Sequence, residues 1–146
     1  MILNLRVDHK IADIQSMENI SKDMDDLFQE LQEKYSIGEY VEISTCNRKE
    51  YYINNDFISE DDELLSHENQ SIIIEYGQSA VMHLLRMTSG LESMIVGEDQ
   101  ILGQVKDAKH KAAKNHHCGK TLDAIFTKAI HVGQVVRNKT NINKGS

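Results

Sequence analysis

Apolar and polar residues alternate over several short stretches of the chain, which is the period of a half-buried β-strand. The first stretch is residues 2–7, where every second position is apolar. The same alternation indicates strands over residues 39–44 and 49–54. A β-branched run at residues 71–76 predicts a fourth strand. We therefore expect a small sheet whose second and third strands are antiparallel, because the connection between them is short.

Other segments repeat apolar residues every three to four positions, which is the period of a helix with one buried face. The first such segment runs from about Ile11 to Tyr35, with residues 11–14 either part of it or a separate turn. Ser21 is its expected N-cap, because three aspartates follow closely and suit a helix N-terminus. Three further helices are expected, at residues 78–89, at residues 99–115 and, with Thr121 as N-cap, over the last part of the chain.

The order of these elements is strand, helix, two strands, a loop, one strand and then helices. This order predicts an α+β fold, with a small, mostly antiparallel four-stranded sheet and helices followed by a helical half. A chain of 146 residues is long enough to bury a core of its own. We expect residues 1–146 to form a single domain.

Composition and charge narrow the class of protein. No apolar run approaches the roughly 20 residues that cross a bilayer, so no membrane partner is expected. The N-terminus lacks the order of a signal peptide, and two cysteines do not make a disulfide framework, which indicates a cytoplasmic protein with reduced thiols. The net charge of −7 is unevenly divided, because residues 1–105 hold 7 Lys/Arg and 21 Asp/Glu, whereas residues 106–146 hold 9 and 2. Such a basic end is compatible with nucleic-acid binding, but it is more often a solvated helix face.

Between the second and third predicted strands lies the motif Ser44-Thr45-Cys46-Asn47-Arg48. If these residues stay extended, Ser44, Cys46 and Arg48 point to one face of the sheet. A thiol beside a permanent cation can hold an anionic substrate while the sulfur attacks it. The alternative is a polar loop with a half-buried cysteine, since free cysteines usually pack as small apolar residues.

A second cluster of polar groups occupies residues 83–104. His83 is the residue type suited to acid–base work near neutral pH, although it also fits a polar position on a helix flank. Gln100 and Gln104 are four residues apart and share one helix face. Glycines at three positions in this stretch indicate turns or a close backbone approach.

Together, the Ser44–Arg48 motif and the run from Gly90 to Gln104 closely resemble the N-terminal domain of glutamyl-tRNA reductase. The early Asp8-His9-Lys10 and the closing segment 136–145 are similar to it too, so that the resemblance covers nearly the whole chain. Three departures are visible: the proline usual after the His-Lys pair is absent, Lys49 replaces a commoner threonine, and Asp99 replaces a proline. None of these departures replaces Cys46 itself.

The resemblance implies an enzyme that reduces the glutamyl ester of tRNA to glutamate-1-semialdehyde with NADPH, the first committed step of tetrapyrrole (porphyrin and heme) biosynthesis. It implies that Cys46 is the nucleophile and forms a thioester, and that His83 assists proton transfer or orients the substrate. Arg48 would pair with a carboxylate of glutamate, and Glu98 would meet its ammonium group. The residues implied to bind substrate are Thr45, Arg48, Ser93, Glu98, Gln100 and Gln104.

Cofactor and partners follow from the same resemblance. The sequence contains no Gly-rich dinucleotide fingerprint after a strand, so NADPH is expected on a separate domain that this chain lacks, as is the dimerisation domain. The implied partners are glutamyl-tRNA, a second copy in a full-length homodimer, and the aminomutase that receives the semialdehyde. We expect the chain alone to stop at acyl transfer or slow ester hydrolysis.

Two other readings stay open. The basic end from Lys106 to Lys144 fits a non-catalytic tRNA-binding or regulatory module, although no aromatic residues for stacking on bases are interleaved with its lysine cluster at residues 106–120. The second alternative is a metal site in the segment 110–118. The spacing of its His and Cys residues matches no common zinc pattern, so no metal is expected. Its residues would be His110, His116, His117 and Cys118.

Overall fold

The computed structural model describes residues 1–8, 14–66, 71–91 and 100–144. Four strands form one sheet in the order β2-β3-β1-β4, and every neighbouring pair is antiparallel. The predicted α+β class with a four-stranded sheet is therefore confirmed. The strands are β1 (Ile2–Asp8), β2 (Glu39–Ser44), β3 (Arg48–Asn54) and β4 (Ile73–Tyr76).

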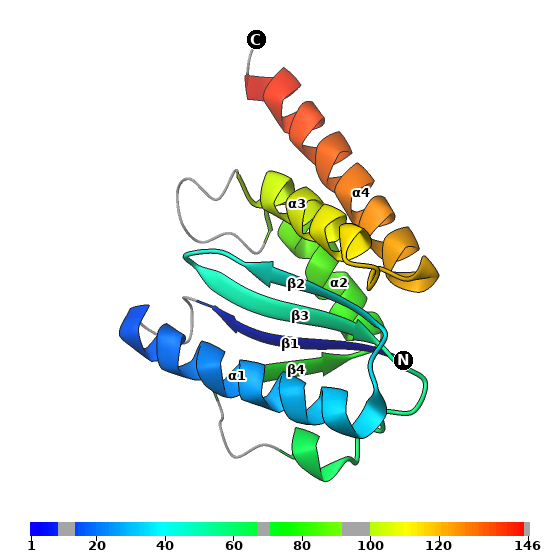
Figure 1. Cartoon of the computed structure of the whole chain (residues 1–146). Coiled ribbons are helices and arrows are strands. Elements are labelled where there is room, and N and C mark those ends of the chain that lie inside the picture. Colours follow the sequence, from blue (N-terminus) through cyan, green and yellow to red (C-terminus); the bar gives the residue numbers. More distant parts are fainter. Residues whose placement is uncertain (9–13, 67–70, 92–99, 145–146) are drawn as a thin grey trace.

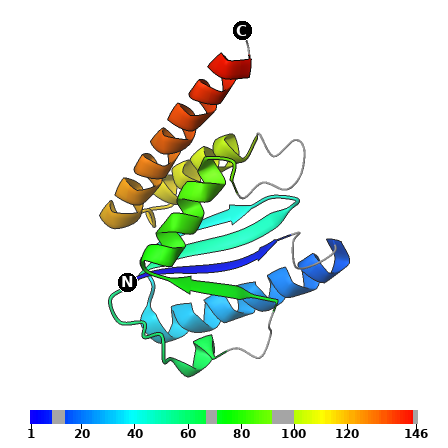
Figure 2. The same ribbon diagram turned by 180° about the vertical axis from the view of Figure 1, so that it is seen from behind.

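Helices cover both faces of the sheet, which gives three layers (Figure 1). One helix, α1, lies on one face, and α2, α3 and α4 lie on the other, as the view from behind also shows (Figure 2). None of the described helices is long and apolar enough to cross a membrane. The helices are α1 (Ile14–Tyr35), the short 3-10 helix η1 (Glu63–Leu65), α2 (Gln78–Thr88), α3 (Ile101–Lys114) and α4 (Lys120–Lys144).

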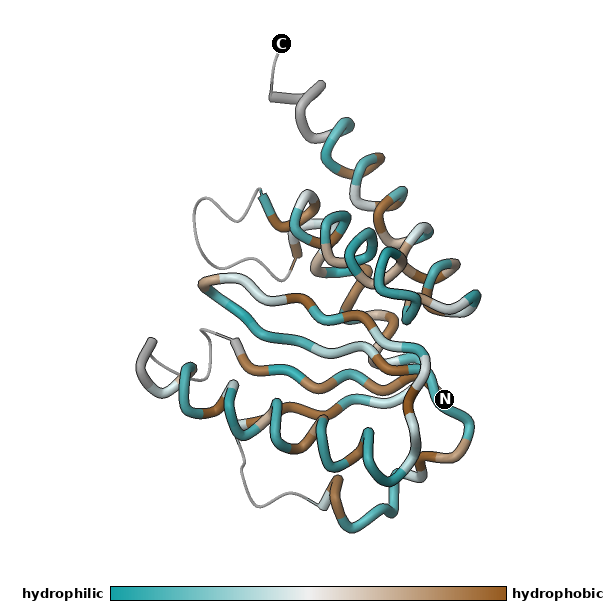
Figure 3. Tube along the Cα trace, viewed as in Figure 1, coloured by the Kyte–Doolittle hydropathy of each residue, from teal (hydrophilic) through white to brown (hydrophobic). Residues whose placement is uncertain are grey.

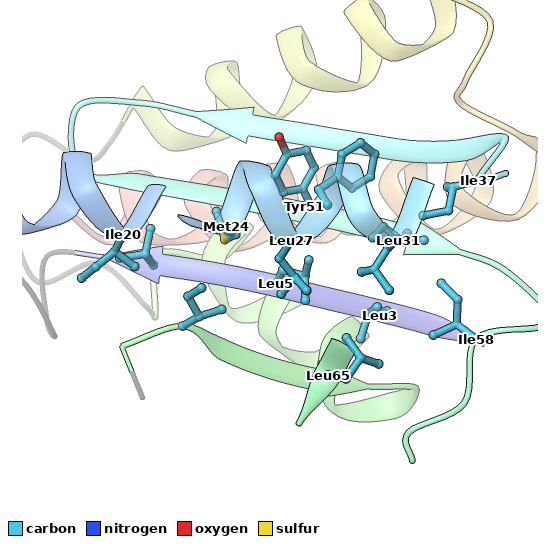
Figure 4. Packing of buried hydrophobic residues seen from close by; sticks show 14 of the residues in the cluster. Leu3, Leu5, Ile20, Met24, Leu27, Leu31, Ile37, Tyr51, Ile58 and Leu65 are labelled. Carbon is cyan, nitrogen blue, oxygen red and sulfur yellow. The ribbon is translucent and has the colours of Figure 1, made fainter. Parts of the chain in front are cut away.

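The first core fills the space between α1 and the sheet (Figure 4). Strand β1 contributes alternate apolar residues to it, and the colouring by hydropathy in Figure 3 shows this alternation along the sheet. The prediction that Ser21 caps the helix is wrong, because α1 already begins at Ile14. Met17 and Ile20 are buried and continue the apolar stripe toward the N-terminus, so the chain stays helical through Ser21.

A second core lies between the other face of the sheet and α2, α3 and α4. Tyr52 of β3 meets Phe126 of α4 edge to face, with ring centroids 5.3 Å apart. Helix α4 begins at Lys120, so Thr121 lies in its first turn and not at the cap position predicted for it. The Leu122 N–H donates to Glu39 Oε1 at 2.6 Å, so that a side chain of β2 satisfies a donor at this helix N-terminus.

The loop between α3 and α4 is tied to the start of β2. Tyr40 N–H donates to the His117 carbonyl at 2.7 Å, and His117 Nδ1 lies 2.8 Å from the Tyr40 carbonyl oxygen. The two rings stack with centroids 3.9 Å apart. Because β2 is an edge strand, these contacts occupy part of the outer edge of the sheet.

Two glycines inside helices give a matched pair of substitutions. A Cβ on Gly133 would lie 2.5 Å from the Thr88 carbonyl oxygen, where α4 crosses α2, whereas a Cβ on Gly103 of α3 meets nothing within 4 Å. We expect Gly133→Ala to lower the free energy of unfolding by about 1–3 kcal/mol, because backbone must shift. Gly103→Ala should raise it by about 0.5–1 kcal/mol. Urea denaturation of both variants tests this, and equal effects would contradict the close packing of α4 on α2.

Candidate active site

The Ser44–Arg48 motif forms the tight turn that joins β2 and β3. Thr45 N–H donates to the Arg48 carbonyl at 2.9 Å, and Thr45 Oγ1 accepts from the N–H groups of Asn47 and Arg48, both at 3.2 Å. Cys46 is exposed at the tip of this turn. The residues are therefore not extended, and the common face for Cys46 and Arg48 that an extended strand would give does not form.

Cys46 borders a cavity on the α1 side of the sheet. The cavity has a volume of about 450 Å³, and its walls come from the hairpin turn and the first half of α1. Both charge signs are present around the thiol, which suits a substrate that carries an ammonium and a carboxylate. The lining residues are Met17, Glu18, Ser21, Lys22, Asp25, Thr45 and Cys46.

Arg48 points to the opposite side of the sheet, toward α2. Its side chain is 1% exposed, and its guanidinium donates to Glu50 Oε2 at 3.1 Å. The same nitrogen lies 3.2 Å from the sulfur of Met87 on α2. A cation at this depth needs a buried carboxylate, and Glu50 supplies it two residues along the same strand face.

His83 of α2 converges on the same carboxylate. Its Nε2 lies 3.0 Å from Glu50 Oε1 and 3.2 Å from Oε2. Tyr52 donates its hydroxyl proton to Glu50 Oε1 at 3.0 Å, and Asn4 Nδ2 donates at 3.3 Å. The structure thus brings the predicted residues Arg48 and His83 together around one buried carboxylate, behind the hairpin that carries Cys46.

The charge of Glu50 is fixed by this network. Burial alone would raise the pKa of the Glu50 carboxyl, but the hydrogen bond and charge of His83, with the charges of Arg48 and Arg6, lower the pKa to about 2. Burial raises the pKa of Tyr52 far above its ordinary value, and the Glu50 charge raises it further. Glu50 is therefore ionised and Tyr52 protonated at neutral pH, as a donor–acceptor pair requires.

Glu50, Asn4 and Tyr52 were not singled out from the sequence. A signal was present in β3, where Arg48, Glu50 and Tyr52 occupy alternate positions and so share a face. Two charged residues two apart in a strand that is otherwise buried predict an internal ion pair. The partner from α2 carries no such local signal.

Of the remaining predicted residues, Gln100 and Gln104 lie at the start of α3, and the others lie outside the described residues. Gln100 is exposed just before α3, and Gln104 follows one turn later. Gln104 lines a groove of about 220 Å³ with Ser44 and Lys111, so the structure brings it to the edge of β2 next to the motif. Ser93 and Glu98 lie outside the described residues.

Sites for a metal ion or a dinucleotide have no counterpart among the described residues. These residues contain no group of three or more His, Cys, Asp or Glu side chains placed to hold a metal ion, and this includes the His110–Cys118 segment. The described sheet has only antiparallel pairs, whereas a dinucleotide-binding turn joins parallel strands through a Gly-rich loop at a helix N-terminus. The described residues contain no turn of this kind.

Fold and site together define an α+β domain that presents an exposed thiol on a hairpin backed by a buried Arg–Glu–His network. The family described as "Glutamyl-tRNAGlu reductase, N-terminal domain" matches residues 5–140. The chain belongs to this family.

Individual relatives agree with the family assignment. The glutamyl-tRNA reductase of Methanobrevibacter smithii is 80% identical over 146 residues, which are 100% of this chain and 37% of that protein. The glutamyl-tRNA reductase of Methanothermobacter marburgensis is 46% identical, with 100% of this chain and 35% of that protein covered. The solved glutamyl-tRNA reductase from Methanopyrus kandleri superimposes with a TM-score of 0.76 at 30% identity, over 94% of this chain and 34% of that one. The chain thus spans about a third of the length of the relatives it matches.

Proposed function

We propose that this chain takes the glutamyl group from glutamyl-tRNA onto Cys46 as a thioester, in the pathway to tetrapyrroles. The observation that carries the proposal is the exposed Cys46 thiol at the hairpin tip, next to a cavity lined by both charge signs. The thiolate attacks the ester carbonyl, a C–S bond forms, and the ester C–O bond breaks. The terminal ribose of tRNA leaves as an alcohol, and its oxygen takes up one proton.

The network behind the hairpin supports this step by position and charge. In our proposal Arg48 pairs with a substrate carboxylate, and His83 moves a proton or orients the substrate, as the resemblance implies. Both side chains are held by Glu50, which stabilises their orientation before substrate arrives. Because Arg48 is 1% exposed and lies across the sheet from the Cys46 cavity, this pairing requires the hairpin to rearrange when substrate binds.

Reduction of the thioester requires hydride, which NADPH supplies in the reaction that the resemblance implies. Because the described residues contain no dinucleotide-binding turn, we assign only acyl transfer to this chain. Thr45 and Gln104, with Ser93, Glu98 and Gln100, would bind the glutamyl moiety.

The test is incubation of this chain with glutamyl-tRNA, followed by intact mass measurement. The expected result is a protein species heavier by one glutamyl residue, which disappears slowly as water hydrolyses the thioester. With NADPH added, we expect no glutamate-1-semialdehyde. An unchanged protein mass at every pH near neutrality would defeat the proposal, and NADPH-dependent semialdehyde would refute the restriction to acyl transfer.

A second candidate is a non-catalytic tRNA-binding module, favoured by the basic charge of α3 and α4. It predicts that the chain binds tRNA, that no glutamyl adduct forms, and that Cys46→Ser leaves tRNA affinity unchanged. The adduct therefore discriminates the two functions in the same experiment.

A further inference from the structure

The outer layers of the molecule carry opposite charges. Helix α1 has six Asp/Glu against two Lys. On the other face of the sheet, α3 and the part of α4 up to residue 139 hold eight Lys/Arg against two Asp. The basic end recognised in the sequence is thus one layer of the fold, separated from the acidic layer by the sheet (Figure 1).

Within the basic layer, α3 presents a continuous exposed stripe. Lys106, His110, Lys111 and Lys114 are all exposed and recur at helical spacing, with Asp107 as the acidic residue among them. Lys109 differs from them, because it pairs with Asp123 at 3.2 Å and donates to Thr127 at 3.0 Å. Lys106, Lys111 and Lys114 form no ion pair with another described residue. From Lys106 to Lys114 the helix rises about 12 Å.

A groove connects this stripe with the hairpin. Lys111 lines the cavity that Ser44 and Gln104 also line. Ser44 lies two residues before Cys46 in the sequence. Lys111 also lines a second cavity of about 220 Å³ with Tyr40 and His117. Both cavities include Glu42, whose carboxylate is bound by Lys49 at 2.7 Å, so that its charge is compensated. A ligand whose reactive end is at Cys46 can therefore extend along the edge of β2 onto α3.

We propose that the exposed stripe of α3, formed by Lys106, Lys111 and Lys114, binds phosphates of the acceptor arm of glutamyl-tRNA while its aminoacylated end lies at Cys46. This inference rests on the proposed acyl transfer and adds the surface that holds the nucleic acid. Lysines bind phosphate as point charges and release condensed counterions, so they add affinity without reading sequence. The acidic face of α1 repels the same backbone, which orients the tRNA on the domain.

The double variant Lys111→Gln/Lys114→Gln tests the surface, with tRNA binding measured by fluorescence anisotropy at several salt concentrations. We expect the Kd for tRNA to rise about fivefold or more near 0.1 M salt, and the slope of log K against log salt to fall by about 1–2. Gln29→Glu/Gln78→Glu is the matched control, because it also lowers the net charge by two at exposed positions, on α1 and at the start of α2. Its tRNA affinity should change less than twofold.

Glutamyl-adenosine separates this proposal from the acyl transfer on which it rests. It carries the same ester without the phosphate backbone, so the single variant Lys114→Gln, at a position that lines neither the groove of Gln104 nor the cavity of Cys46, should form the glutamyl adduct from it at the parental rate. Parental tRNA affinity in the double lysine variant, or equal weakening in both double variants, would overturn the basic surface while the parent still forms the adduct. No adduct from either donor in the parent would instead overturn the acyl transfer.

Discussion

Replacing Cys46 by serine is expected to lower the rate of glutamyl-adduct formation from glutamyl-tRNA by about 10³-fold or more. A serine hydroxyl is a far weaker nucleophile than a thiol at neutral pH, because it forms almost no anion there. Intact mass measured over time gives the rate for parent and variant. The substitution changes one atom on an exposed turn, so the free energy of unfolding should stay within about 0.5 kcal/mol of the parental value.

The chain provides its own control in its second cysteine. Cys118 is half-buried between α3 and α4, and burial, followed by the charges of Asp123 and Glu39, raises the pKa of its thiol. Cys118→Ser should form the adduct at a rate within twofold of the parental one. If the adduct survived in Cys46→Ser and vanished in Cys118→Ser, Cys118 would be the nucleophile and our assignment of Cys46 would be wrong.

Glu50→Ala is expected to lower the free energy of unfolding by about 3–5 kcal/mol, because it leaves the Arg48 guanidinium buried without its carboxylate. His83, Tyr52 and Asn4 lose their common hydrogen-bond partner at the same time. Urea denaturation at pH 7 measures the loss. In folded Glu50→Ala, adduct formation should also slow, since Arg48 and His83 are no longer held in place.

The pH dependence of stability tests the same residue in a second way. The pKa of Glu50 is lowered from 4.5 to about 2 by the folded structure, so ionised Glu50 contributes about 3 kcal/mol above pH 4.5. That contribution is lost progressively as the pH falls from about 4.5 to 2, because in this range Glu50 binds a proton more readily in the unfolded chain than in the folded one. Glu50→Gln should remove this part of the acid profile, and an unchanged profile in the variant would contradict the assigned role of Glu50.

Local sequence patterns were sufficient for most of the fold. Strand β2 occupies the predicted residues 39–44, and β3 begins at residue 48, one residue earlier than predicted, because alternation of apolar and polar residues is a local property. The predicted helix from about Ile11 to Tyr35 agrees with α1, and only its N-cap was wrong, because Ser21 has the chemistry of a cap while the buried residues before it continue the helix. Cap chemistry is a weaker signal than the burial of an apolar stripe.

The candidate site was predictable only in part, and for a physical reason. Cys46 was expected between two strands and lies there, because a hairpin turn is encoded by adjacent residues. The burial of Arg48 depends on α2, which contacts Arg48 through Met87 and the Glu50 carboxylate through His83, from more than 30 residues along the chain. Contacts of this range arise from packing of layers and have no periodic signature in one sequence.

The contact between Tyr40 and His117 has a consequence for how the molecule behaves in concentrated solution. An open edge strand is a template on which another chain can add a strand, which leads to aggregation. Here the His117 backbone and ring occupy the first outward-facing position of β2, and the opposite edge strand, β4, is only four residues long. Among the described residues, neither edge offers a long, free ladder for intermolecular pairing, so the hairpin that carries Cys46 can remain exposed without recruiting a second sheet.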